Sequence, residues 1–140
     1  MKTHPRREFL LRVLAACGTP LAASIEAASV KVPPQAEKRI DAGSRAAASY
    51  FGAGVDAARA VGEAYLRQLN VEPTRASILQ HAADTLEILA KAPSQKAALS
   101  ALVTAVRRDF AEGRVLVLEG WVLSRTEVEL CALTVLPAAI

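Results

Sequence analysis

Apolar residues recur at spacings of three and four between Phe51 and Phe110, and this periodicity limits what the chain can fold into. Such spacing places the apolar side chains on one face of a helix. The pattern is interrupted by helix-ending residues at Pro73, Pro93 and Gly113. We therefore expect three amphipathic helices, over residues 44–70, 74–91 and 94–113.

The pattern changes after Gly113. Residues 114–118 and 121–123 are aliphatic and β-branched, apart from Arg114 and Trp121, and Glu119-Gly120 is a plausible tight turn. This segment is either a two-stranded hairpin or one extended stretch. Ser124 and Glu127 then form a capping box, so a final helix should begin near Arg125. The predicted fold is mainly α, a compact four-helix bundle with a short β-hairpin or extended segment before the last helix.

The first residues read as an export signal. Arg6, Arg7, Phe9 and Leu10 precede an alanine-rich apolar run that continues to Ala23. This arrangement resembles the twin-arginine motif, which implies export in a folded state by the twin-arginine translocase to the periplasm. We expect a signal over 1–24, a linker over 25–43 and a helical domain over 44–140.

Cys17 has two interpretations. The four residues ending at Cys17 resemble a lipobox, which would make this cysteine a lipid anchor. Alternatively, Cys17 is a small apolar residue of a cleaved signal. The preceding apolar run is short and contains Arg12, which favours cleavage between about Ser24 and Ser29 without lipidation.

Charge gives no support for nucleic-acid binding. Residues 1–24 hold four of the 17 basic residues and one of the 14 acidic residues, which leaves thirteen of each in the mature chain. The basic excess therefore belongs to the export signal. Cys131 is the only cysteine after the signal, so no intramolecular disulfide can form, and we expect a buried, unreactive thiol.

Residue patterns typical of enzymes are weak in this sequence. Residues 52–57 fit the dinucleotide fingerprint G-x-G-x-x-A, but they lie in a helical pattern, where we expect glycines that pack helices together. Ser77, His81 and Asp84 share one helix face, and side chains along one helix do not converge as a catalytic triad does. We expect no enzyme activity, no cofactor and no metal.

The block 120–127 contains the only tryptophan of the chain, and it too has two interpretations. In the structural one, Trp121 fills the helical core, and we predict that it is largely buried. In the functional one, Trp121, Ser124, Arg125 and Glu127 form a docking surface, since Trp and Arg are frequent interface anchors. The last helix is apolar nearly all round, so we expect part of it to join this surface.

Together with residues 62–66, this block is similar to a family of small, functionally uncharacterised bacterial proteins with twin-arginine signals. In size and helical content the chain also resembles the small subunits of periplasmic dehydrogenases, which escort a larger enzyme across the membrane. These resemblances imply a non-catalytic accessory subunit that docks on a larger periplasmic oxidoreductase or self-associates. The alternative is a free-standing periplasmic or lipid-anchored envelope binding protein.

Overall fold

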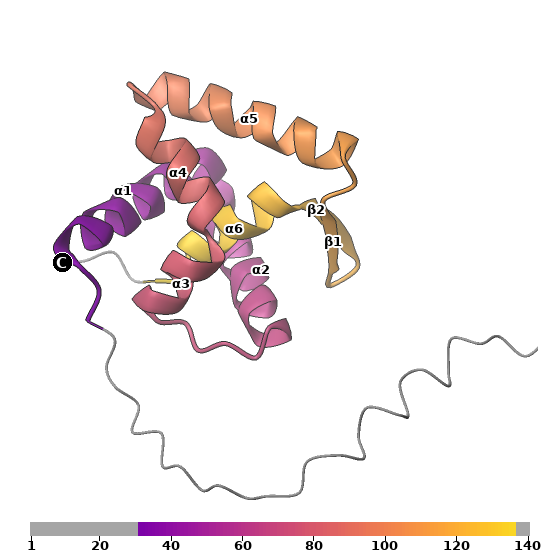
Figure 1. The fold of residues 1–140 in the computed structure, drawn as a ribbon. Coiled ribbons are helices and arrows are strands. Elements are labelled where there is room, and N and C mark those ends of the chain that lie inside the picture. The colour runs from indigo at the N-terminus through magenta and orange to yellow at the C-terminus, as the bar shows by residue number, and fades with distance from the viewer. Residues whose placement is uncertain (1–30, 137–140) are drawn as a thin grey trace, which may run out of the picture.

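The computed structural model describes residues 31–136. The expected export signal with Arg6, Arg7, Phe9 and Leu10, and the alternative lipidation at Cys17, lie outside the described residues. The described elements, in chain order, are α1 (Pro34–Phe51), a 3-10 turn η1 (Gly52–Gly54), α2 (Val55–Gln68), α3 (Arg75–His81), α4 (Ala83–Lys91), α5 (Gln95–Ala111), β1 (Val115–Leu118), β2 (Trp121–Ser124) and α6 (Arg125–Leu133). A mainly helical fold with a hairpin before the last helix is thereby confirmed (Figure 1).

Helix α6 lies at the centre of the molecule. It packs against each of the other α-helices and against the hairpin (Figure 1). The core gathers around it, and its largest fully buried apolar side chains are Ile40, Leu66, Ile78, Leu86, Leu102, Val128, Leu130 and Leu133. The expectation that apolar residues of α6 would be exposed for docking is therefore wrong, because every residue from Val128 to Leu133 is buried; only Arg125, at the start of the helix, is exposed.

Helix α1 begins at Pro34, ten residues before the predicted start. The expected linker over 25–43 is therefore wrong from Pro34 onward. The two prolines suggested a break, but proline is well tolerated in the first turn of a helix, where no N–H is needed. Burial of Ile40, Gly43 and Ala47 then holds α1 against the rest of the core.

Each of the first two predicted helices is split in two. Between α1 and α2, Gly52 has a φ of 52°, a left-handed conformation that costs glycine little. Nothing lies within 4 Å of an added Cβ at Gly52 or Gly54, so these glycines turn the chain rather than pack helices together. Between α3 and α4, the break falls at Ala82.

Gly62 determines how closely α2 approaches α6. A Cβ built at this position would lie 2.3 Å from the backbone oxygen of Cys131. The absence of a side chain at Gly62 therefore lets the two helix backbones touch. None of the helices described between residues 31 and 136 has an apolar stretch long enough to cross a bilayer.

Candidate functional site: the exposed hairpin

The hairpin is built by its turn and by its β-branched strands. Glu119 and Gly120 both have positive φ values, 50° and 82°. This is the signature of the two-residue type I′ turn, whose twist matches that of the flanking strands. The strands pair antiparallel, with Val117 opposite Val122 and Leu118 opposite Trp121. Of the two sequence alternatives, the hairpin is the correct one.

The register divides the hairpin into two faces. Val115, Val117 and Val122 lie on one face, because side chains alternate along a strand and paired residues share a face. Val117 and Val122 are 64% and 56% exposed. On the opposite face, Leu118 is buried. The hairpin thus covers the helices with Leu118 and presents valines outward, while Trp121 shares the face of Leu118 and lies on the other side from the valines.

Trp121 is 69% exposed, so the prediction of a largely buried tryptophan is wrong. It stands in the last strand pair before the turn, opposite Leu118. The core has no place for it, since leucine and isoleucine side chains from five helices already fill the space around α6. Trp121 and Leu118 therefore differ sharply in burial although they are cross-strand partners.

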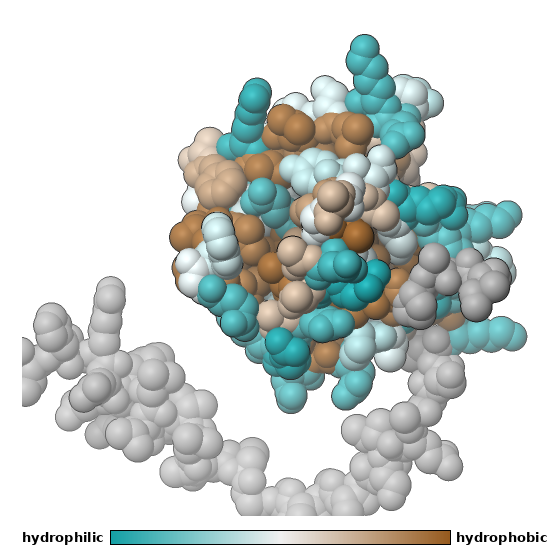
Figure 2. All heavy atoms as spheres, turned by 180° about the vertical axis from the view of Figure 1, so that it is seen from behind, coloured by the Kyte–Doolittle hydropathy of each residue, from teal (hydrophilic) through white to brown (hydrophobic). Residues whose placement is uncertain are grey.

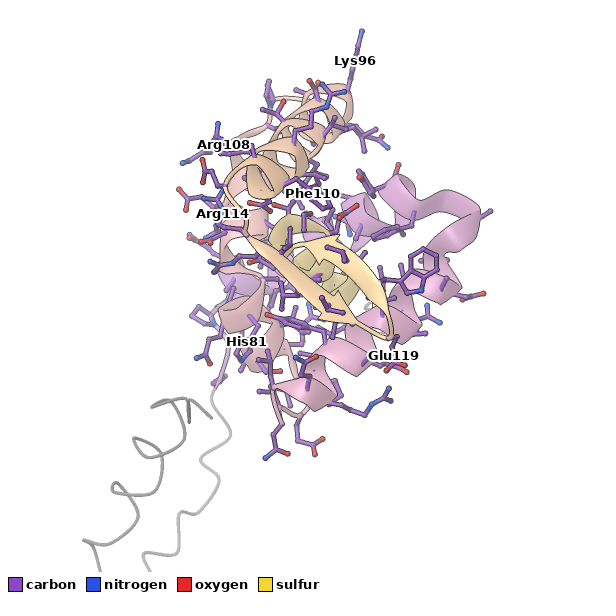
Figure 3. All side chains as sticks on the ribbon, turned by 90° about the vertical axis from the view of Figure 1, so that its right-hand side faces the viewer. His81, Lys96, Arg108, Phe110, Arg114 and Glu119 are labelled. Carbon is purple, nitrogen blue, oxygen red and sulfur yellow. The ribbon has the colours of Figure 1, made fainter. Side chains whose placement is uncertain are left out.

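One exposed aromatic residue from α5 adds to these side chains. Phe110 lies in the last turn of α5 and is 48% exposed. Figure 3 shows it beside the hairpin, with Arg114 at the base and Glu119 at the turn. From behind, hydrophobic surface is seen at the left edge, the side on which the hairpin projects (Figure 2). We use the name hairpin patch for the exposed apolar side chains on both faces of the hairpin and at this end of α5: Phe110, Val115, Val117, Trp121 and Val122.

Asp109 anchors the base of the hairpin. Its carboxylate is buried and accepts hydrogen bonds from the N–H and hydroxyl of Thr126, at 2.8 and 2.7 Å, and from Nε of Arg114 at 2.8 Å. Burial by itself would raise the pKa of Asp109, but these donors outweigh it and hold the pKa below its usual value. Through these hydrogen bonds, the charged side chain of Asp109 joins α5, the base of the hairpin and the first turn of α6.

Glu129 is the second buried carboxylate. It accepts a hydrogen bond from the N–H of Thr85, in the first turn of α4, at 3.0 Å and another from Nε of Arg125 at 3.0 Å. Arg125 also contacts Asp84 at 3.1 Å. Like Asp109, Glu129 satisfies the free N–H groups at the start of a helix. Both carboxylates are thus engaged in holding helices in place.

The four docking residues proposed from the sequence have different roles. Ser124 is fully buried and forms the predicted capping box with Glu127, at 3.1 and 2.9 Å. Arg125 is half exposed but is bound to Glu129. Only Trp121 offers an uncommitted surface. The valines and Phe110 were missed, although the strand-like run 115–118 could have indicated an exposed face.

Ser77 and Asp84, two of the three residues that share a helix face in the sequence pattern, have other partners. The hydroxyl of Ser77 donates to the backbone oxygens of Glu72 and Thr74, while Asp84 pairs with Arg125. Burial raises the pKa of the Cys131 thiol to about 12, as expected of an unreactive cysteine. Within residues 31–136, no three His, Cys, Asp or Glu side chains are placed to hold a metal ion.

Comparison with known proteins identifies no relative, so the geometry of the hairpin patch is the guide to function. The chain matches no protein-family model, no curated protein and no solved structure.

Proposed function

We propose that this protein is an exported, non-catalytic accessory subunit that docks on a larger periplasmic protein through the hairpin patch. One observation carries the proposal. Five apolar side chains, two of them aromatic, are exposed on the hairpin and the adjoining end of α5, with the three valines on one face of the hairpin and Trp121 on the other. So many exposed apolar side chains on one small element favour a surface that a partner covers.

The composition of the patch supports a protein partner. Trp121 and Phe110 are of the aromatic type that is enriched at the centres of interfaces. Arg114 and Glu119 stand at the two ends of the hairpin and would form part of a polar rim. Exposed aromatic side chains flanked by charged residues are typical of specific protein interfaces.

Three features support an accessory rather than a catalytic role. The buried carboxylates of Asp109 and Glu129 are engaged in capping helices. Burial makes the Cys131 thiol a poor nucleophile. The resemblance to dehydrogenase small subunits suggests that the larger partner is an oxidoreductase.

Export is tested through Arg6 and Arg7. Replacing both by lysine should retain the precursor in the cytoplasm, because the translocase recognises the arginine pair. Immunoblots of cytoplasmic and periplasmic fractions provide the measurement, and the mass of the exported chain tells cleavage after the signal from lipidation at Cys17. Wild-type export of the double-lysine variant would overturn the assignment.

Docking is tested by capturing the tagged protein from the periplasm of its own host. The double variant Val117→Lys/Val122→Lys should lose a stoichiometric partner that the wild type retains. Val103→Lys is the matched control, since Val103 is 41% exposed but lies two turns before Phe110 on α5. Retention of the partner by the hairpin variant, or equal loss by both variants, would contradict docking through the patch.

A further inference from the structure

A second surface lies between α1, the end of α4 and the start of α5 (Figure 1). It is an open groove of about 600 Å³. Its apolar lining includes Leu86, Leu89, Ala42, Ala46 and Ala98. Most of these side chains are alanines, so a partner backbone could approach closely, as at helix–helix contacts where small residues line the interface.

The charges around this groove are all positive. Lys38, Arg39 and Arg45 line it, and no acidic residue does. None of these three side chains forms an ion pair with another residue in the described part of the chain. Glu87, which lies near Arg39, is paired with Lys91 at 2.5 Å. The groove therefore presents three cations, none of them in an ion pair within residues 31–136, above an apolar floor.

The polar side chains at the α5 end are already engaged. The Ser94 hydroxyl accepts the N–H of Ala97 at 3.1 Å, and Gln95 donates to the Ser49 hydroxyl at 2.6 Å. Selectivity among ligands therefore depends on the three cationic side chains and on the shape of the apolar lining.

The spacing of the cations indicates what fits. Lys38 and Arg39 are separated from Arg45 by six or seven residues of helix, which is about 10 Å at 1.5 Å per residue. The headgroup of one fatty acid would reach a single end of such a groove. A helix with acidic residues about two turns apart would reach both ends while its apolar face covers the alanines.

We propose that this groove binds an acidic amphipathic helix of a partner protein. The inference rests on the proposed function because both assume a protein partner. It concerns a different surface of the molecule. Lining residues Gln95 and Ala98 belong to the first turn of α5, and Phe110 of the hairpin patch belongs to its last turn. A partner that uses both surfaces would follow α5 from end to end.

The probe is an 18-residue helical peptide with leucines at positions i, i+3, i+4 and i+7 and glutamates beside them. Calorimetry with the exported protein should show binding that weakens as salt increases. The same peptide with lysine in place of glutamate should not bind. Arg39→Gln/Arg45→Gln should weaken binding of the acidic peptide about tenfold, since each exposed ion pair contributes modestly.

Arg67→Gln is the matched control, because Arg67 is exposed on α2 and does not line the groove. Equal binding of both peptides, unchanged affinity of the double variant, or displacement of the peptide by dodecanoate would overturn the proposal. The hairpin variant Val117→Lys/Val122→Lys should bind the peptide as the wild type does. Absence of binding at the groove can therefore be distinguished from absence of docking at the hairpin patch.

Discussion

Among single residues, Asp109 connects three separate segments: α5, the base of the hairpin and the first turn of α6. Its side chain receives two hydrogen bonds from Thr126 and one from Arg114, and its backbone oxygen accepts the N–H of Arg114 at 2.8 Å. A buried charge with three donors is stabilising only while all three remain in place. The orientation of the hairpin patch relative to α6 therefore depends on this one carboxylate.

Asp109→Asn should lower the free energy of unfolding by about 2 kcal/mol at neutral pH, since hydrogen bonds to a charged group are the strong ones. The folded-state pKa of Asp109 is lowered, so its stabilisation is present above the unfolded pKa and is lost as the pH falls through the folded value. Urea unfolding of both proteins at neutral and acidic pH should show the difference shrinking with acidification. A difference in unfolding free energy that stays constant with pH would contradict this role of the Asp109 carboxylate.

Glu119 occupies a conformation that suits it poorly. Its φ of 50° costs a residue with a Cβ about 1 kcal/mol, and asparagine is the residue preferred at this turn position. Glu119→Asn should therefore raise the free energy of unfolding by up to about 1 kcal/mol, measured by thermal melting. Gly120→Ala should do the reverse, because φ there is 82°. Destabilisation by the asparagine variant would contradict the assigned turn.

At the scale of elements, the contact between α2 and α6 has no room for a side chain at Gly62. Gly62→Ala should cost about 3 kcal/mol of unfolding free energy, because the neighbour that must move is backbone rather than a flexible side chain. Gly54→Ala is the control, since nothing lies within 4 Å of its added Cβ and its φ is −87°. Equal melting temperatures for the two variants would show that the helices do not meet at Gly62.

Locally determined elements could be predicted from the sequence. The Ser124–Glu127 capping box and the hairpin turn depend on residues three or four apart; the box is present as expected, and the hairpin is one of the two alternatives that the sequence left open. The break at Ala82 could not be predicted, because Glu129, which binds the N–H of Thr85, is 44 residues away in the chain. The exposure of Trp121 depends on how the leucines of other helices fill the core, and the residues near Trp121 in the sequence do not predict this filling.

For the whole molecule, α5 joins the two proposed contact surfaces. Its first turn contributes to the cationic groove and its last turn holds Phe110. Its 17 residues span about 25 Å. A partner that contacts both ends of α5 would therefore bind over a distance comparable to the diameter of a small domain. Two weak contacts joined in one partner can bind far more tightly than either alone.

Light scattering on the untagged protein, purified from its own host and separated at low salt, tests docking through the hairpin patch most directly. The account predicts a molar mass well above that of one chain, and a fall to the mass of one chain for Val117→Lys/Val122→Lys. Val103→Lys should retain the higher mass. A wild-type protein that elutes as a single chain, with no stoichiometric partner, would contradict the central claim.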